Sequence, residues 1–244
     1  MLKKTALVVH GGAWTIPDEA IAACEAGCRQ ALEHGWAVLE KGGTAVDACQ
    51  EAIVVLEDEP VFDAGTGSHL NRDGRVQLDA ILMDGRTLKS GAVCATERLR
   101  NPIQVARLVL ERSQHMMLVG PGAEQFAVEM GVSLCNPSEL VVAREVEAWY
   151  KLKHETETAR GLFLGNHQLG TVGAVALDAA GNLAAGVEPQ AAADRAVALL
   201  QERTEGKGGL IVVDGSGRVG FAFSTSHMAF AYRTSELPEP VVGL

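Results

Sequence analysis

The residues best suited to do chemistry in this chain are Gly170 and Thr171, where a polar stretch meets the apolar run Val172–Leu177. A threonine hydroxyl can turn back onto the preceding carbonyl, and a glycine there places no side chain in its way. If the chain cuts itself at this bond, Thr171 becomes an N-terminus. Its α-amine, with an ordinary pKa of about 7.7–8.0, then serves as base for its own hydroxyl. The alternative is an ordinary β-branched residue that opens a strand.

The composition is that of a globular protein with an acidic surface. The chain has 244 residues, of which 47% are hydrophobic and 27 are glycine, and a formal net charge of −10. This charge disfavours binding to nucleic acid or to an anionic membrane surface. The longest apolar runs are far shorter than a membrane span. We therefore expect a small-molecule or peptide substrate.

The cysteine count indicates reduced thiols rather than a disulfide framework, because it is odd and the spacing is irregular. The five are Cys24, Cys28, Cys49, Cys94 and Cys135. Cys24 and Cys28 would share one face of a helix, which favours core packing over a metal pair. The apolar stretch that follows Lys3 and Lys4 is too short for a secretory signal, so we expect a cytoplasmic protein.

Several segments have clear local structure. A buried strand is predicted over Thr5–His10, ended by Gly11-Gly12, and a glycine turn beside a core histidine is favoured there over an esterase-like oxyanion hole. Further elements are expected at the following places: helices over 17–40, 44–56, 101–109, 122–130, 140–152 and 189–203, strands over 76–82, 88–95 and 116–119, hairpins over 173–184 and 209–220, a last strand over 228–232, and a polar linker over 153–161.

The segment Glu57–Ser68 is irregular, because Pro60 lacks a donor and two glycines favour tight turns. Such a loop exposes many backbone carbonyls. Those oxygens suit a hard monovalent cation, and a solvated acidic loop is the alternative.

Taken together, these pieces resemble the plant-type asparaginases, also called isoaspartyl peptidases or β-aspartyl-peptidases, within the N-terminal nucleophile hydrolases. The matching segments run in family order: His10–Ala13, Asp63–Gly67, Leu78–Ala80, Met83–Gly85, Leu99–Pro102, Gly170–Asp178 and Gly208–Ile211. The resemblance implies an α+β fold, a four-layer αββα sandwich that forms one domain over residues 1–244. It also implies autocatalytic cleavage into an α chain, 1–170, and a β chain, 171–244.

The resemblance further implies that Thr171 is the nucleophile that hydrolyses L-asparagine or β-aspartyl dipeptides through an acyl-enzyme. Asp63 would have a supporting role near it. No organic cofactor is expected. A structural sodium ion would be held mainly by the backbone carbonyls of Leu56, Glu57, Glu59, Phe62, Ala64 and Thr66. The assembly implied is a homodimer of αβ units.

One departure from the family is large. Family members continue after the strand that ends near Ala185 into T-S-T-G-G, G-R-x-G-D-S-P and T-G-x-G-E segments, and this chain passes directly to a helix. The missing block would carry a second threonine, the residues that bind the substrate's α-carboxylate and α-amine, and the oxyanion hole. Two alternatives therefore stay open: a non-catalytic or deletion-variant relative, and a glycosylasparaginase or protein-cutting threonine aspartase.

Overall fold

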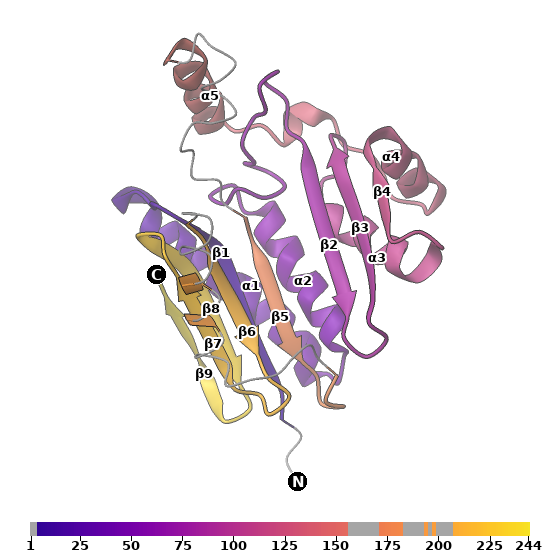
Figure 1. Ribbon diagram of the computed structural model, residues 1–244, viewed down its shortest axis with the longest axis vertical. Coiled ribbons are helices and arrows are strands. Elements are labelled where there is room, and N and C mark those ends of the chain that lie inside the picture. Colours follow the sequence, from indigo (N-terminus) through magenta and orange to yellow (C-terminus); the bar gives the residue numbers. More distant parts are fainter. Residues whose placement is uncertain (1–3, 156–170, 183–192, 195–196, 199–206) are drawn as a thin grey trace.

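The computed structural model describes residues 4–155, 171–182, 193–194, 197–198 and 207–244 (Figure 1). Its central sheet is antiparallel, with the strand order β5-β1-β8-β9. The strands are β1 (Ala6–Trp14), β5 (Gly173–Leu177), β8 (His227–Thr234) and β9 (Leu237–Gly243). The sheet joins the two ends of the chain, because β1 pairs with β5 on one side and with β8 on the other.

Two long helices cover one face of this sheet, α1 (Asp18–Glu40) and α2 (Ala45–Asp58). Alternation along β1 explains the packing: Leu7 and Val9 point into a core shared with both helices. Their neighbours Ala6 and Val8 point to the opposite face. The second helix begins at a capping box in which Thr44 and Asp47 exchange hydrogen bonds, at the start of the helix predicted over 44–56.

A two-stranded sheet covers the opposite face of β1 and β5. It consists of β6 (Gly209–Val213) and β7 (Val219–Phe223), and Val213 packs with Val8 and Leu177. On the outer side of β6 and β7, the helical residues Ala193 and Val197 pack against Ala222. The order helix, sheet, sheet, helix confirms the four-layer α+β sandwich predicted from the sequence.

A third sheet stands beside the central one, in the order β2-β3-β4. Its strands are β2 (Leu78–Asp84), β3 (Lys89–Thr96) and β4 (Met117–Val119). Two helices, α3 (Pro102–Arg112) and α4 (Gly120–Glu129), pack against it around Val93. A short 3-10 helix, Pro137–Glu139, leads to α5 (Ala143–Glu155), which stands at the top of Figure 1.

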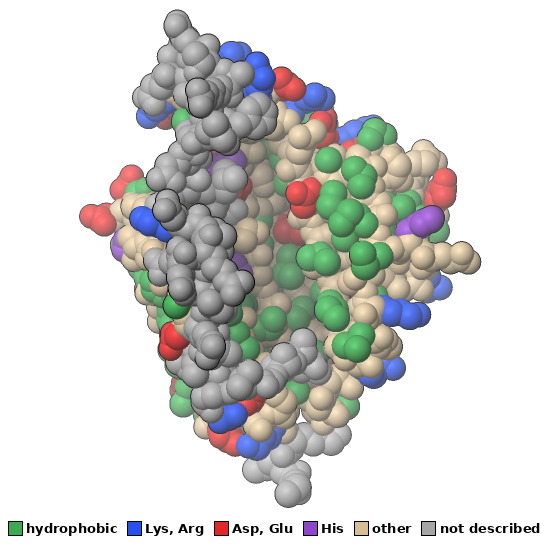
Figure 2. Space-filling view, viewed as in Figure 1, with side chains coloured by type: hydrophobic (Ala, Val, Ile, Leu, Met, Phe, Trp, Pro, Cys, Tyr) green, Lys and Arg blue, Asp and Glu red, His purple; other side chains and the backbone are tan. Residues whose placement is uncertain are grey.

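The other face of this third sheet is apolar and exposed, and Figure 2 shows hydrophobic side chains gathered there. Ile81 on β2 is in register with Ala92 on β3, and Ala92 with Met117 on β4. Ile81, Met83, Met117 and Val119 are between 46% and 64% exposed, which is unusual for such a row.

Several sequence predictions need correction or lie outside the described residues. The strand over 228–232 is not the last, because β9 follows it. Pro238 and Pro240 interrupt the strand pattern of β9, so the sequence did not indicate this strand. Prolines are tolerated there because β9 lies at the edge of its sheet. The helix predicted over 140–152 runs from Ala143 to Glu155 and so includes the start of the predicted linker. Most of the helix over 189–203 and residues 183 and 184 at the end of the hairpin over 173–184 are outside the described residues.

The five cysteines are unpaired, and Cys24 and Cys28 are fully buried, which confirms core packing for that pair. Among the described helices, none is both long enough and apolar enough to cross a membrane.

Phe62 is the largest fully buried side chain, and it fixes the loop that follows α2. A Cβ added at Gly27 would lie 2.7 Å from its ring, and one at Gly11 would also clash with the ring. We expect Phe62→Ala to lower the free energy of unfolding by about 3–5 kcal/mol, because it leaves a cavity that these neighbours cannot fill. Urea unfolding measures this loss. Phe62→Leu should lose clearly less, and equal losses would contradict this role for the ring.

Candidate active site

Thr171 is exposed, two residues before β5, and lies directly against the Gly11-Gly12 segment inside β1. Gly12 has φ of +95°, and a Cβ there would lie 2.8 Å from the carbonyl oxygen of Thr171 and 3.3 Å from its nitrogen. Only glycine allows this approach without strain. The strand predicted to end at Gly11-Gly12 instead continues to Trp14, with an irregular register between His10 and Ala13, so the two glycines form a bulge inside β1. Gly12 in this bulge contacts the backbone of the predicted nucleophile.

The side chain of His10 packs between the Gly11-Gly12 segment and β5. Its Nδ1 accepts a hydrogen bond from the backbone N–H of Gly12 at 3.2 Å, so that nitrogen is unprotonated. A Cβ added at Gly173 would lie 2.5 Å from Nε2. The imidazole ring therefore fits only because residue 173 is a glycine. Burial lowers the pKa of His10 to about 4. The imidazole is therefore neutral at physiological pH and holds the Gly11-Gly12 segment and β5 together.

This depressed pKa predicts acid sensitivity. Below pH 6.5 the unfolded chain takes up a proton at His10 that the folded chain does not, so the free energy of unfolding falls as the pH drops towards about 4, by up to about 3 kcal/mol. Urea unfolding at about pH 7 and about pH 4.5 measures the difference. His10→Asn keeps an acceptor for Gly12 but does not titrate, and should show a smaller difference. The same loss in both proteins would contradict the assignment.

A cavity of about 710 Å³ brings the predicted nucleophile together with the predicted supporting residue. Thr171, Val172 and Gly173 line it from β5, and Asp63 and Ala64 from the loop after α2. The titratable side chains in its lining are those of Glu57, Asp63, His69, Asp79 and Cys94. Among the described residues its lining includes no lysine or arginine, so it offers no ammonium or guanidinium group to bind a substrate carboxylate.

Glu57 is a buried acid in the wall of this cavity, 3% exposed. Its Oε1 accepts a hydrogen bond from the backbone N–H of Ile103, in the first turn of α3, at 3.1 Å. Its Oε2 is buried without a partner in the described structure. Burial raises the pKa of Glu57 to about 8, so the side chain is mostly protonated at neutral pH.

Asp63 is fixed by His69, six residues further along the chain. The backbone N–H of His69 donates to Asp63 Oδ1 at 2.8 Å, and His69 Nε2 lies 3.7 Å from Asp63 Oδ2. The other ring nitrogen, Nδ1, is 2.5 Å from Glu145 Oε2 on α5. The hydrogen bond with Glu145 raises the pKa of His69, so an imidazolium is favoured between two carboxylates.

The loop predicted to bind sodium has hard oxygen donors. The Glu57 carbonyl accepts a hydrogen bond from the backbone N–H of Thr66, and the Glu59 carbonyl accepts one from the backbone N–H of Phe62. The Phe62 carbonyl accepts one from Arg144 Nη2. Each of these three oxygens keeps a second lone pair. The Thr66 hydroxyl is buried without a partner in the described structure. These residues suit a monovalent cation chemically, and of the six predicted ligands only Glu57 and Ala64 also line the Thr171 cavity.

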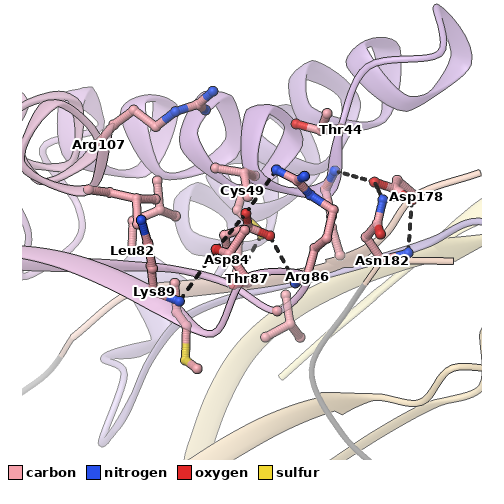
Figure 3. A pocket seen from close by; sticks show the side chains of 18 of the residues that line it. Thr44, Cys49, Leu82, Asp84, Arg86, Thr87, Lys89, Arg107, Asp178 and Asn182 are labelled. Carbon is pink, nitrogen blue, oxygen red and sulfur yellow. Dashed lines mark hydrogen bonds and ion pairs between the residues drawn. The ribbon is translucent and has the colours of Figure 1, made fainter. Parts of the chain in front are cut away.

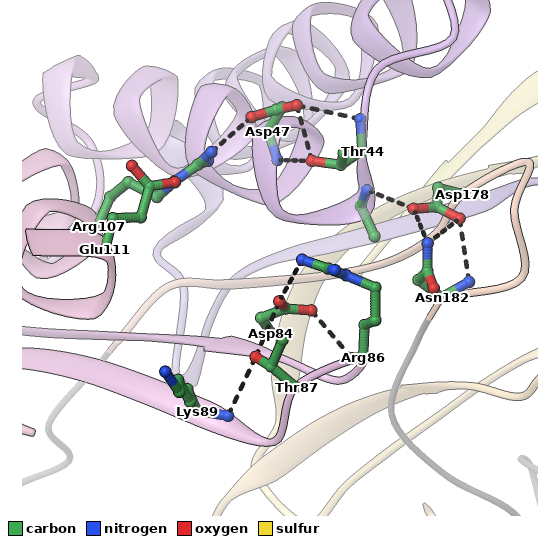
Figure 4. Close-up of polar contacts among 11 residues, drawn as sticks. Thr44, Asp47, Asp84, Arg86, Thr87, Lys89, Arg107, Glu111, Asp178 and Asn182 are labelled. Carbon is green, nitrogen blue, oxygen red and sulfur yellow. Dashed lines mark hydrogen bonds and ion pairs between the residues drawn. The ribbon is translucent and has the colours of Figure 1, made fainter.

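A second cavity of about 670 Å³ adjoins the first, and both are lined by Ile53, Ile81 and Ala174 (Figure 3). Its charged groups are mostly paired with one another (Figure 4). Asp84 accepts from Arg86 and Thr87, and Arg107 pairs with Asp47 at 2.8 Å and with Glu111.

Asp178 ties the turn after β5 to α2 at the edge of this cavity, since its carboxylate accepts from the backbone N–H groups of Ala45 and Asn182. Cys49 donates to the carbonyl of Ala174 at 3.5 Å. We interpret these contacts as structural.

The structure brings Thr171 and Asp63, two residues that the sequence predicts for the site, to one cavity, and Gly12 lies against the backbone of Thr171. Gly170 lies outside the described residues. Sequence reasoning missed His69, Arg144 and Glu145, because they come from a loop and a helix 76 positions apart with no motif that joins them.

The fold is an α+β sandwich in which a threonine two residues before the edge strand β5 lines a cavity. The chain matches the family described as asparaginase over residues 3–189, and it belongs to that family. It is 35% identical to an isoaspartyl peptidase/L-asparaginase of Danio rerio, over 92% of this chain and 91% of the relative. It is 36% identical to a plant-type L-asparaginase of Pyrococcus horikoshii, over 98% of this chain and 99% of the relative.

The alignments also show that this chain is short. The alignment with the Pyrococcus horikoshii protein has 307 positions against 244 residues here, so at least 63 positions of that relative have no counterpart. An isoaspartyl peptidase/L-asparaginase of Homo sapiens is 45% identical over 179 residues, which cover 73% of this chain and 58% of the relative. The family match ends at residue 189, close to the place after Ala185 where the sequence predicts the missing block.

Proposed function

We propose that this protein is a self-processing threonine amidohydrolase that acts on L-asparagine or on β-aspartyl dipeptides. The observation that carries the proposal is the position of Thr171, exposed at the head of β5 and on the same cavity as Asp63. The names of its relatives support the substrate class.

In the first reaction, the Thr171 hydroxyl oxygen attacks the carbonyl carbon of Gly170. The C–N bond breaks, the nitrogen takes the hydroxyl proton, and an ester joins the two residues. Water then hydrolyses this ester, which leaves a carboxylate on Gly170 and a free α-amine on Thr171. The products are an α chain, 1–170, and a β chain, 171–244.

In the second reaction, the new α-amine takes the proton of the Thr171 hydroxyl as the oxygen attacks the substrate's side-chain amide carbon. The proton passes to the leaving nitrogen, so ammonia or the released amino acid departs and an aspartyl ester forms. Hydrolysis of that ester by water releases aspartate and restores the hydroxyl.

The supporting parts of the proposal concern the surroundings of Thr171. Asp63, oriented by His69, supports the nucleophile from across the cavity. A sodium ion held by carbonyls of the loop over 56–66 would order that loop. We also propose that the αβ units form a homodimer and that the protein is cytoplasmic. The five unpaired cysteines favour the cytoplasm, where thiols stay reduced.

Intact-mass spectrometry tests the cut, and aspartate release from L-asparagine and from a β-aspartyl dipeptide tests the hydrolysis. We expect two fragments that meet between residues 170 and 171, and release of aspartate. An intact chain after long incubation, with no aspartate released, would exclude the proposal.

A non-catalytic relative is the second candidate, and two observations favour it. At least 63 positions of a full-length relative are missing here, and no arginine of the described residues lines the Thr171 cavity. The loss of one oxyanion donor alone typically costs about 10²–10³ in rate. Turnover that depends on Thr171 would rule this candidate out.

A further inference from the structure

The first turn of α5 holds the loop that carries Asp63. The Arg144 guanidinium donates to three backbone carbonyls of that loop: to Pro60, to Phe62 at 3.3 Å and to Gly67 at 3.0 Å. One planar donor group therefore joins both ends of the segment Pro60–His69.

The loop is shaped to receive this guanidinium. Gly67 has φ of +98°, and a Cβ there would lie 3.1 Å from Arg144 Nη2, so a side chain at this position would displace the arginine. The backbone N–H of Gly67 also donates to the carbonyl of Leu140 at 2.9 Å, shortly before α5. The loop is thus bonded to the chain on both sides of the helix start.

Glu145 continues the contact into the cavity. It is 5% exposed, and its two oxygens have different partners: Oε1 accepts from Arg144 Nε at 2.9 Å, and Oε2 lies 2.5 Å from His69 Nδ1. Although burial opposes it, the hydrogen bonds with His69 and Arg144 hold the pKa of Glu145 below its ordinary value. Since His69 N–H donates to Asp63, the chain Arg144, Glu145, His69, Asp63 connects α5 with the cavity of Thr171.

A second anchor of α5 reaches the next part of the same loop. Trp149 Nε1 donates to the carbonyl of Asn71 at 2.9 Å, and a Cβ at Gly74 would lie 3.1 Å from the indole ring. In Figure 1, α5 stands beyond the end of the sheets, above this loop. The anchors at Arg144, Glu145 and Trp149 therefore all meet residues 60–74.

We propose that Arg144 and Glu145 are positioning residues that hold the segment Pro60–His69 in place, so that attachment of α5 and the position of Asp63 in the Thr171 cavity are coupled. The inference deepens the proposed function, and its catalytic readout depends on that function. It gives α5, the last described helix before the bond to be cut, a direct effect on the site.

Hydrogen exchange of the amides over 60–69 tests the coupling in the full chain, with Thr171→Ala in all samples so that cleavage does not interfere. Glu145→Gln removes the charge and keeps the shape. Glu147→Gln makes the same change at an exposed position of the same helix and is the matched control. We expect exchange about tenfold faster or more in Glu145→Gln and Arg144→Met, because each removes hydrogen bonds to a charged group. Arg144→Lys, which keeps the charge, should recover part of the protection.

Kinetics with native Thr171 give the readout that a purely structural role would not change. We expect Glu145→Gln to lower kcat about tenfold with little change in KM, while Glu147→Gln keeps both values. Exchange over 60–69 equal in Glu145→Gln and Glu147→Gln would overturn the inference. If the native protein has no turnover, the proposed function fails, and the exchange comparison still decides the coupling.

Discussion

Replacement of Thr171 by alanine is expected to leave the chain uncut and to abolish hydrolysis, with a loss on the order of 10⁶-fold in kcat, the scale seen when a catalytic nucleophile is removed. The reason is that the Thr171 hydroxyl is the attacking group in both reactions, and the methyl side chain of alanine has no nucleophilic oxygen. Intact-mass spectrometry measures the first effect and aspartate release the second.

Two variants make that result specific. Thr171→Ser keeps a hydroxyl and should retain part of both reactions. Thr87→Ala removes a hydroxyl from a turn outside the Thr171 cavity, where it donates to Asp84, and should change neither reaction. Hydrolysis that survives in Thr171→Ala would show that another group is the nucleophile.

Local rules predicted the parts of this fold in which pattern and structure agree. Residues 6–10 lie in the buried part of β1, the helix predicted over 44–56 begins after its cap at Thr44, and β5 begins two residues after Thr171. Each depends on neighbours within a few residues, so sequence spacing was enough. The layer order followed from the family resemblance, and the alternating faces of β1 explain it physically.

Sequence reasoning could not find contacts between distant polar groups. The pair His69 and Glu145 joins a loop to a helix, and neither residue belongs to a periodic pattern or a motif. The position of Gly12 against Thr171 is similar: the sequence indicates a turn, but which backbone approaches it depends on the pairing of β1 with β5.

The second sheet is short among the described residues, and one face of the third sheet is apolar and exposed. Among the described strands, only β6 and β7 cover the central sheet, over β1 and β5, while Ile81 and Met117 on the third sheet remain exposed.

The second large effect is expected from Gly12→Ala. The new Cβ would lie 2.8 Å from the Thr171 carbonyl oxygen, and the backbone has φ of +95°, so Thr171 must shift. A displacement of about 1 Å at a reacting group costs on the order of 10² in rate. We therefore expect both self-cleavage and hydrolysis to slow by about this factor, measured as the fraction cut over time and as kcat/KM.

The control separates displacement of Thr171 from backbone strain. Gly42 has φ of +80° and no atom within 4 Å of an added Cβ, so Gly42→Ala carries similar strain without touching the site. Both variants should lose about 1–2 kcal/mol of unfolding free energy from the left-handed backbone conformation. Only Gly12→Ala should slow the two reactions, because only there does the added methyl group press on the residue that must attack. Equal rates in the two variants would mean that the Gly11-Gly12 segment serves the fold alone.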